Sequence, residues 1–325
     1  MRHCIFNNNA FDPDSFLCVK GLKRFSKGRS DVNTGTLLLG VDGGGTRCRA
    51  RLCATSGAKL GEAAAGPANI RFGLSQSFSA VLHATTQCLG QAGLSPRDFP
   101  RIVACLALAG ASEPAALAEA QEHEHPFRRA VITTDAHAAC VGAHGGRDGG
   151  VIVVGTGTVG WAELRGRSHR VGGWGLPVSD EGSGAWLGCE ALRRVLWAHD
   201  GHIPWTGLLT ALFEQYRADP HAIVRWTSNA APKDFGSLVP AIVDHASRGD
   251  PAAVELMQLA AGHVDALAQR LVAFGAERLA LVGGLAAHIE RWLAQDTRIH
   301  LVPPAGDALE GALQLARAAA RSVAA

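Results

Sequence analysis

The sequence of 325 residues lacks several features that define whole classes of protein. It has one tyrosine and two methionines, charged residues make up only 18% of it, and it contains no run of 18 apolar residues. A membrane-spanning helix needs about 20 such residues, so none is predicted. The N-terminus has no apolar segment followed by a small-residue cleavage site, so a secretory signal is not expected either.

The eight cysteines are scattered, and no two of them form a C-x-x-C pair. In a chain of this length, such spacing is typical of reduced and mostly buried thiols. We therefore expect a cytoplasmic protein without structural zinc. His123-Glu124-His125 offers two metal-ligand side chains, but a solvated loop before a strand explains this segment better.

The formal charge of +2 is concentrated at one end of the chain. Residues 1–35 hold six of the 31 basic residues and three of the 29 acidic ones, which leaves residues 36–325 with a net charge of −1. A nucleic-acid-binding domain would normally carry a basic patch with interleaved aromatic residues, and residues 36–325 show none. We expect neither nucleic acid nor a membrane as a partner.

Apolar runs separated by glycine turns predict an α/β protein in which one unit occurs twice. The unit is strand, glycine turn, strand, first at residues 37–54 and again at 151–164. Further strands are expected at 59–64, 102–108, 130–134 and 279–282. Helices are expected at 74–93, 114–122, 136–143, 183–197, 207–217, 236–248, 251–274 and 307–323.

Residues 155–160 match the G-x-G-x-x-G pattern of dinucleotide-binding sites, and Asp180 follows about 20 residues later. In those sites a helix opens at the third glycine and binds the pyrophosphate at its N-terminus. Here residues 160–164 alternate between polar and apolar, and the glycines at 172–175 disfavour a helix further on. The pattern therefore predicts a hairpin, and a nicotinamide oxidoreductase stays an alternative that only a helix at residues 160–164 would support.

The two glycine turns can each bind an anion, because glycine lets backbone N–H groups approach a phosphate closely. Thr46 and Thr156 add a hydroxyl to each turn, and Asp42 ends a strand where a carboxylate can face Mg²⁺ on phosphates. No G-x-x-x-x-G-K-[ST] motif occurs, which excludes a P-loop. Taken alone, each turn is better explained as an ordinary tight turn, and capping of the first turn is the alternative role for Asp42.

Taken together, three motifs resemble those of the sugar kinase, Hsp70 and actin superfamily. Asp42–Thr46 is similar to its first phosphate motif, Gly155–Gly157 to its second, and Val282–Gly284 to its adenosine motif. The chain further resembles the BadF/BadG-type ATPase family and, within it, the amino-sugar kinases. The segments that carry this resemblance are Asp42–Arg51, Gly66–Ile70, Leu106–Ala111, Thr133–Ala136, Gly172–Gly184 and Asp307–Ala312.

The resemblance implies a two-domain α/β fold, duplicated and RNase H-like, with the active site in the cleft between the domains. Residues 36–147 would form the first domain together with a C-terminal helix at 307–325, and residues 148–306 would form the second. Residues 1–35 are polar and aperiodic, and we interpret them as a disordered or over-long N-terminal tail.

The same resemblance implies an ATP-dependent, Mg²⁺-requiring kinase that phosphorylates the 6-hydroxyl of an amino sugar. Glucosamine is the first expectation for the acceptor and N-acetylglucosamine the alternative. The expected partners are therefore small molecules, the amino sugar and ATP, and a homodimer is an open alternative for the oligomeric state.

Residue by residue, the resemblance assigns Asp135 as the general base, although its place between a strand and a helix would by itself favour an N-cap. Asp42 would bind Mg²⁺. Trp174 would pack on the sugar ring, with an ordinary core tryptophan as the alternative, and Glu181 would face a protonated 2-amino group. The ATP-binding set is Gly43, Gly44, Gly45, Thr46, Gly155, Thr156, Gly157, Gly283 and Gly284, and the sugar-binding set is Asn69, Gly173, Trp174, Asp180 and Glu181.

Two further classes remain as remote alternatives. A sugar-responsive repressor would need an N-terminal helix-turn-helix, for which the 35-residue tail is short and irregular. An ATPase activator of a radical dehydratase would need cysteines for a shared iron–sulfur cluster, and Cys105 and Cys140 lie among apolar residues without an obvious second ligand.

Overall fold

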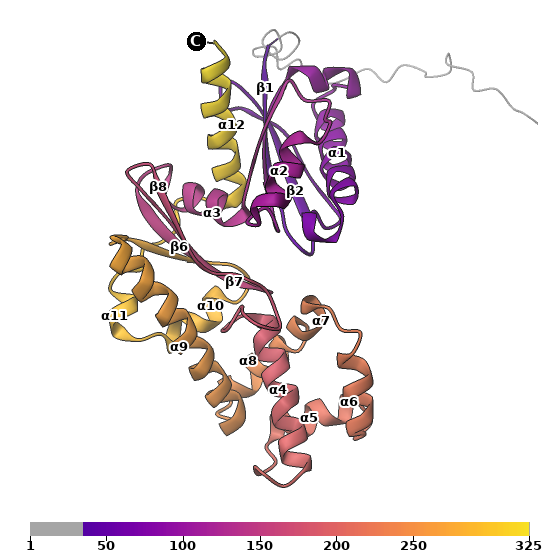
Figure 1. Ribbon diagram of the computed structural model, residues 1–325, viewed down its shortest axis with the longest axis vertical. Helices are drawn as coiled ribbons and strands as arrows, with labels where there is room; N and C mark the ends of the chain where they lie inside the picture. The colour runs from indigo at the N-terminus through magenta and orange to yellow at the C-terminus, as the bar shows by residue number, and fades with distance from the viewer. Residues whose placement is uncertain (1–34, 325) are drawn as a thin grey trace, which may run out of the picture. The chain divides into compact units, whose positions relative to one another are not determined.

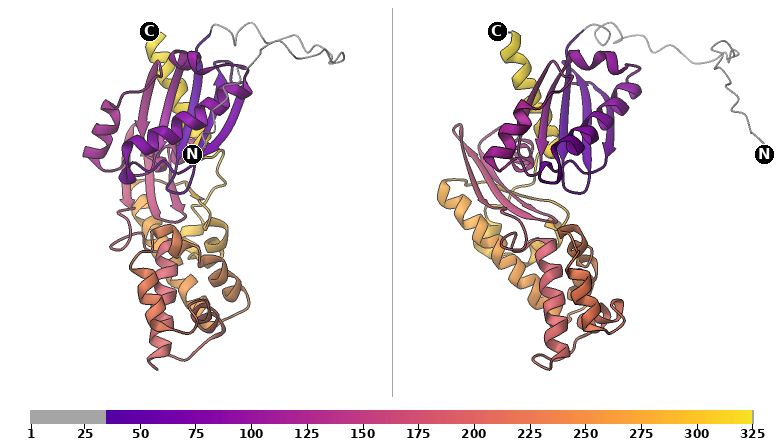
Figure 2. Two further views of the ribbon diagram at one scale, coloured as in Figure 1. Left: turned by 90° about the vertical axis from the view of Figure 1, so that its right-hand side faces the viewer. Right: turned by 45° about the vertical axis from the view of Figure 1, so that its right-hand side comes forward.

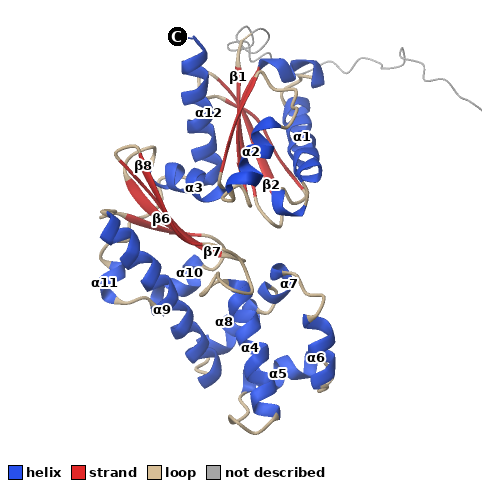
Figure 3. Ribbon diagram, in the orientation of Figure 1, coloured by secondary structure: helices blue, strands red, loops and turns tan. Residues whose placement is uncertain are grey.

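The computed structural model describes residues 35–324, so the predicted tail at residues 1–35 lies outside the described residues except for Gly35. The described chain is an α/β protein with two mixed sheets, as predicted (Figures 1 and 3). Within this part of the chain, no helix combines the length and the apolar character that crossing a membrane requires.

The first sheet has five strands in the order β3-β2-β1-β4-β5. Strand β1 is antiparallel to β2 and parallel to β4, which in turn is parallel to β5. The carboxyl ends of β1, β4 and β5 therefore meet at one edge. The strands are β1 (Leu37–Gly43), β2 (Cys48–Ala54), β3 (Lys59–Ala65), β4 (Ile102–Leu108) and β5 (Arg129–Thr133).

Strand β1 is buried on both faces, which explains why its sequence is an apolar run rather than an alternating one. Leu37 and Leu39 belong to the core that includes Phe78 of α1 (Leu74–Gln91). Leu38 belongs to the opposite core with Leu313 of α12 (Ala308–Ala324). Helices α1 and α12 thus cover opposite faces of the sheet (Figure 1).

The second sheet has four strands in the order β8-β7-β6-β9, with the same directions as β3-β2-β1-β4. This confirms the predicted duplication and extends it from two strands to four. The strands are β6 (Gly149–Val154), β7 (Thr158–Leu164), β8 (Arg167–Gly172) and β9 (Leu279–Val282). Because residues 160–164 form a strand, the helix required by the dinucleotide-binding alternative is absent there.

Helix α9 (Pro251–Phe274) lies along one face of the second sheet (Figure 2). Its Leu271 fills the space beside Gly150 and Gly160. The segment between β8 and α9 forms a helical layer. The helix expected at 236–248 is present at Val239–Ser247, whereas the short helix before it, at Pro232–Gly236, was not expected. The helices of this segment are α4 (Gly184–His199), α5 (Gly207–Gln215), α6 (Pro220–Thr227), α7 (Pro232–Gly236) and α8 (Val239–Ser247).

Helix α3 (Asp135–His144) packs on β6 and β7 of the second sheet and also on α12 of the first. The approach to α12 is close enough to require glycine at two positions. A Cβ on Gly142 would lie 2.0 Å from the Asp307 carbonyl oxygen, and a Cβ on Gly311 would lie 1.9 Å from that of Ala138. Glycine at these positions therefore sets the distance between the helix that starts at Asp135 and the segment that carries Asp307.

The remaining elements are short. They are η1 (Ile70–Phe72), η2 (Pro96–Arg101), α2 (Pro114–Glu122), α10 (Ala286–Ile289), η3 (Glu290–Trp292) and α11 (Gln295–Arg298). The division predicted at residue 147 falls between the end of α3 and the start of β6, and it stays a prediction.

Candidate active site

The first glycine turn joins β1 to β2. The Gly44 N–H donates to the Arg47 carbonyl at 2.9 Å, and the Ala109 N–H donates to the Gly43 carbonyl at 2.7 Å. Gly45 and Thr46 are exposed at its tip. Only Gly43 is sterically fixed, since a Cβ there would lie 2.7 Å from Leu108. The turn therefore presents exposed backbone at the carboxyl end of β1.

The second glycine turn joins β6 to β7 and is tied to the start of α4. The Gly155 and Thr156 carbonyls accept hydrogen bonds from the N–H groups of Gly184 and Ala185 at 2.8 and 3.1 Å. Thr156 is exposed. The Gly155 N–H also donates within the turn, to the Gly157 carbonyl at 2.9 Å. Hydrogen bonds inside the protein thus fix the turn, and the Thr156 side chain stays exposed.

Gly283 and Gly284 follow β9, which is parallel to β6 with Val282 opposite Val153. The glycine pair therefore lies at the same sheet edge as the second turn. Gly283 has φ of +106°, and a Cβ there would lie 2.3 Å from the Val154 carbonyl oxygen, whereas Gly284 has no atom within 4 Å of its Cβ position. Backbone geometry thus demands glycine at 283 but not at 284.

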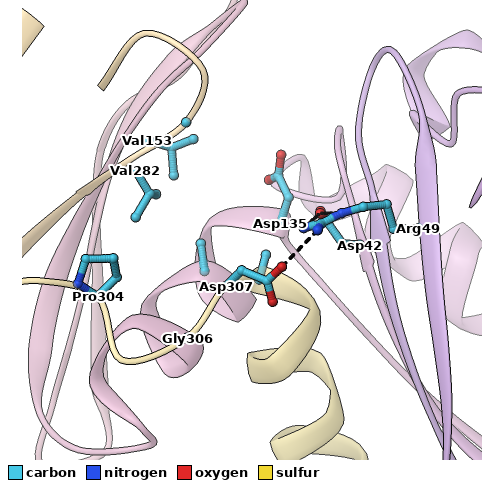
Figure 4. A pocket seen from close by; sticks show the side chains of 11 residues that line it. Asp42, Arg49, Asp135, Val153, Val282, Pro304, Gly306 and Asp307 are labelled. Carbon is cyan, nitrogen blue, oxygen red and sulfur yellow. Dashed lines mark hydrogen bonds and ion pairs between the residues drawn. The ribbon is translucent and has the colours of Figure 1, made fainter. Parts of the chain in front are cut away.

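A cavity of about 430 Å³ lies at the carboxyl ends of these strands (Figure 4). Asp42, Asp135 and Asp307 line one side with Arg49, and Val153, Val282 and Pro304 line the other. Of the predicted site residues, the cavity brings together Asp42, Asp135 and Gly283. Its lining does not include the other predicted ATP-binding residues, which are Gly43, Gly44, Gly45, Thr46, Gly155, Thr156, Gly157 and Gly284.

Asp135 is the first residue of α3, directly after β5. The N-cap is Thr134, whose hydroxyl accepts the His137 N–H at 3.0 Å, so Asp135 does not have the capping role that its position suggested. Its Oδ1 accepts the N–H of Ala136 at 2.9 Å. Burial raises the pKa of Asp135, and the charge of Asp42 raises it further, against the opposing effects of the Ala136 N–H and Arg170.

Asp42 does not cap its turn but forms an ion pair with Arg49, the residue opposite it on β2. Arg49 donates to Oδ2 of Asp42 from Nε at 3.2 Å and from Nη2 at 2.8 Å. Its third nitrogen, Nη1, donates to Oδ2 of Asp307 at 2.8 Å. Burial alone would raise the pKa of Asp307, but the Glu310 N–H and Arg49 together lower it.

Trp174 is 64% exposed, which excludes the core role considered for it. Arg170 lies over its ring at 4.2 Å from the centroid and donates to the carbonyls of Gly172, at 3.0 Å, and Gly173. Asp180, with φ of +65°, accepts the Gly175 N–H at 3.0 Å. Burial raises the pKa of Asp180.

Asn69 reaches the same loop through its neighbour Arg71. The Asn69 Oδ1 accepts the Arg71 N–H at 3.0 Å, and Nη1 of Arg71 donates to the Trp174 carbonyl at 3.5 Å. Two predicted sugar-binding segments from different parts of the chain are thereby in contact.

Glu181 lies apart from the large cavity. It lines a second cavity of about 140 Å³ with Thr158, Gly173 and His263. The Thr158 hydroxyl is buried there without a hydrogen-bond partner among the described residues. The structure therefore places Glu181 beside the Gly172–Gly173 turn, on a different cavity from Asp135.

No group of three or more His, Cys, Asp or Glu residues in 35–324 is arranged to bind a metal ion by itself. This fits Mg²⁺ bound to a nucleotide, since that ion is typically held by one or two carboxylates together with phosphate oxygens and water. Asp42 supplies such a carboxylate at the wall of the cavity.

The sequence profile of the BadF/BadG/BcrA/BcrD ATPase family matches residues 39–300. The chain belongs to this family. Glucosamine kinase GspK of Vibrio cholerae is 41% identical over 278 residues, which are 86% of this chain and 95% of that protein. N-acetylmuramic acid/N-acetylglucosamine kinase of Clostridium acetobutylicum is 26% identical over 232 residues, which are 69% and 75% of the two chains.

A crystal structure from Chromobacterium violaceum, provisionally assigned as an N-acetylglucosamine kinase, superposes with a TM-score of 0.82 at 35% identity, covering 87% of this chain and 99% of that one. Component A of (R)-2-hydroxyglutaryl-CoA dehydratase from Acidaminococcus fermentans gives a TM-score of 0.50 at 13% identity, covering 90% of this chain and all of that one, and shows the fold alone. The predicted family and the two-domain sugar kinase/actin-like fold are thus confirmed.

The remote alternatives find no support in this BadF/BadG-family chain. Burial raises the pKa of both Cys105 and Cys140 to about 12, which disfavours the thiolates that an iron–sulfur cluster would need. The helix-turn-helix of a repressor would fall within residues 1–35, nearly all of them outside the described residues.

Sequence reasoning missed four side chains of this site: Arg49, Arg71, Arg170 and Asp307. The three arginines stand at polar positions of strands or loops, which are usually solvated. One signal was present for Arg49, because a hairpin that pairs Gly43 with Cys48 must also pair Asp42 with Arg49. The family motifs carried no comparable signal for Arg71 or Arg170.

Proposed function

We propose that this BadF/BadG-family protein is an ATP-dependent hexosamine kinase that transfers the γ-phosphate of ATP to the 6-hydroxyl of glucosamine. The observation that carries the proposal is that Asp135 and Asp42 line one cavity with Gly283 at the carboxyl ends of strands from both sheets. A general base, a metal-facing carboxylate and a nucleotide-facing glycine are the parts that phosphoryl transfer to an alcohol needs.

Asp135 is proposed as the general base. Its carboxylate accepts the proton of the 6-hydroxyl as that oxygen attacks the γ-phosphorus in line and the bond to the β,γ-bridging oxygen breaks. The raised pKa makes this carboxylate a stronger base than an exposed aspartate. Since Thr134 is the N-cap of α3, the Asp135 side chain is not required to cap the helix.

The two glycine turns are proposed to hold the phosphates. Backbone N–H groups of Gly45 and Gly157, with the hydroxyls of Thr46 and Thr156, would donate to phosphate oxygens. The N–H groups of Gly44 and Gly155 already donate within their turns, so these glycines and Gly43 would serve by letting the phosphates approach the backbone closely. Gly283 and Gly284 would lie against adenosine. Asp42 would hold Mg²⁺ through water, and that ion would supply positive charge to neutralise the phosphates.

The sugar is proposed to bind between Asn69 and the loop from Gly173 to Asp180. The exposed ring of Trp174 offers an apolar face for the pyranose, and Asn69 and Asp180 offer polar groups for its hydroxyls. The contact of Arg71 with the Trp174 carbonyl supports this placement, because it joins the two segments.

Glucosamine is the proposed acceptor because the relative that is 41% identical bears that activity in its name. N-acetylglucosamine is the alternative, which the similarity to the Chromobacterium violaceum protein supports. We also propose that residues 36–147, with the C-terminal helix, and residues 148–306 are the two domains whose closure excludes water from the reaction.

The proposal is tested by ADP release with glucosamine, N-acetylglucosamine, glucose and mannosamine as acceptors. We expect turnover with glucosamine and a fall of about 100- to 10,000-fold in kcat for Asp135→Asn. Turnover of Asp135→Asn near the wild-type rate would remove Asp135 as the base. Absence of turnover with every hexosamine would exclude the proposed hexosamine kinase activity.

A further inference from the structure

Arg49 joins two carboxylates at the wall of the large cavity, and no family motif assigns it a role. It reaches Asp42 and Asp307, both at 2.8 Å, and all three side chains line the cavity with Asp135 (Figure 4). A single positive charge between two negative ones leaves the group with a net charge of −1. This group therefore contributes the charge of one carboxylate to the wall, to which Asp135 adds a further acidic side chain.

The hydrogen bonds of Arg49 distinguish the two oxygens of Asp42. Both bonds from Arg49 end on Oδ2, and no donor within residues 35–324 reaches Oδ1. Two charge-assisted hydrogen bonds that converge on one oxygen hold that oxygen in place and so restrict rotation of the carboxylate. One oxygen is thus occupied, and the other remains available to a ligand in the cavity.

Arg49 is itself held in place from the other side. Asp307 accepts Nη1 of Arg49 on Oδ2, and its Oδ1 accepts the Glu310 N–H at 3.0 Å in the first turn of α12. The backbone of Asp307 lies against Gly142 of α3, the helix that begins at Asp135. The position of the Asp42 carboxylate is therefore linked through Arg49 to the helices that carry the rest of the cavity.

We infer that Arg49 is a positioning residue for the metal–nucleotide complex: it holds Oδ2 of Asp42 so that Oδ1 faces the hydrated Mg²⁺ of MgATP, and Asp307 anchors it. This inference rests on the proposed function for the role of Asp42. Lysine at position 49 would keep the charge but has no fork with which to bridge both carboxylates. Supporting residues of this kind typically change metal affinity or activity by about 10- to 100-fold.

Arg51 provides a matched control. It lies two residues further along the same strand and likewise joins two carboxylates, Glu62 at 2.8 Å and Glu310 of α12 at 3.4 Å. It does not line the cavity. Arg51→Lys therefore disturbs the same strand and a neighbouring ion pair with α12, while the contact with Asp42 stays intact.

The test measures the affinity of the full-length protein for ADP by calorimetry, once with Mg²⁺ and once with EDTA, in the absence of sugar. We expect Mg²⁺ to increase ADP affinity in the wild type and in Arg51→Lys. In Arg49→Lys this gain should shrink by about 10-fold or more while affinity in EDTA stays the same. Because no sugar is present, this result is independent of whether hexosamines are substrates.

Three results would overturn the inference. A wild-type Mg²⁺ gain in Arg49→Lys would show that Asp42 needs no positioning, and an equal loss in Arg51→Lys would assign the effect to general packing of α12. Weaker binding of Arg49→Lys in EDTA by the same factor would make Arg49 a direct phosphate ligand instead. Should Arg49→Lys unfold, Asp307→Asn keeps an acceptor for the Glu310 N–H but loses the charge that anchors Arg49, and it should show a reduced gain in the same assay.

Discussion

Asp180 lies directly against Gly157: a Cβ on Gly157 would stand 2.5 Å from the Asp180 Oδ2. This contact joins the proposed sugar loop to the second phosphate turn. A substitution in the turn should therefore displace side chains of the loop. It also explains a glycine at 157 by the presence of a carboxylate rather than by backbone conformation, since Gly157 has no positive φ.

Gly157→Ala should therefore displace the Asp180 carboxylate and raise the KM for the sugar as well as for ATP. We expect an increase of at least about 10-fold in sugar KM, comparable to the loss of one hydrogen bond to a charged group. The control is Gly155→Ala in the same turn, where a Cβ meets no atom within 4 Å. The measurement is steady-state kinetics with each substrate varied in turn. An increase in the KM for ATP alone, in both variants, would contradict this prediction.

Asp135→Asn should make the folded protein more stable at neutral pH while it removes activity. The folded-state pKa of Asp135 is raised above the ordinary value of 3.8, so its ionisation costs stability once the pH exceeds that range. Asparagine cannot ionise and can still accept the Ala136 N–H. We expect a rise in Tm of the order of 2 °C at pH 7.

The pH dependence provides the check on this stability difference. It should shrink as the pH falls and vanish well below 3.8, because Asp135 is then protonated in the folded and unfolded states alike. Calorimetric Tm values that fail to converge at low pH would argue against a buried, destabilising carboxylate.

Substitutions in the glycine pair after β9 should have different effects, on stability at position 283 and on nucleotide binding at position 284. Gly283→Ala places a Cβ 2.3 Å from the Val154 carbonyl at a φ of +106°, so it should cost about 1–3 kcal/mol of stability. Gly284→Ala meets no protein atom within 4 Å and should leave the Tm unchanged. If adenosine lies against the pair, Gly284→Ala raises the KM for ATP; an unchanged KM would place the nucleotide elsewhere.

Glu181→Gln should change the preference between acceptors rather than the rate with all of them. A carboxylate near a protonated 2-amino group favours glucosamine, so its loss should raise the KM for glucosamine by roughly 10-fold and leave that for N-acetylglucosamine unchanged. Because Glu181 lines the second cavity with Thr158, Thr158→Val is the matched change of a neighbouring uncharged group. An unaltered ratio of the two KM values in Glu181→Gln would remove Glu181 from recognition of the amino group.

The sequence predicted the strands of both sheets except β8, because apolar or alternating segments of strand length stand on either side of each glycine turn. It also separated the hairpin at residues 155–160 from a dinucleotide-binding turn, since the alternation after Gly160 has the period of a strand. The helices between β8 and α9 were less predictable. Pro232 begins a short helix of its own there, and α6 was not foreseen.

Only the site residues that belong to sequence motifs could be predicted from the sequence. The positions of Asp42 and Asp135 at strand ends follow from the order of apolar runs, and both line the cavity. The partners of these residues come from distant parts of the chain: Asp307 lies 258 residues after Arg49. Such contacts depend on the packing of α12 against α3, which local sequence patterns do not specify.

The most direct test of the proposed kinase is to identify its product. After incubation of the protein with MgATP and glucosamine, phosphorus-31 NMR correlated with proton signals locates the new phosphate. We predict one sugar phosphate, on the 6-oxygen of glucosamine, formed in equal amount to ADP. Release of ADP with inorganic phosphate alone, or a phosphate on another oxygen, would contradict the account.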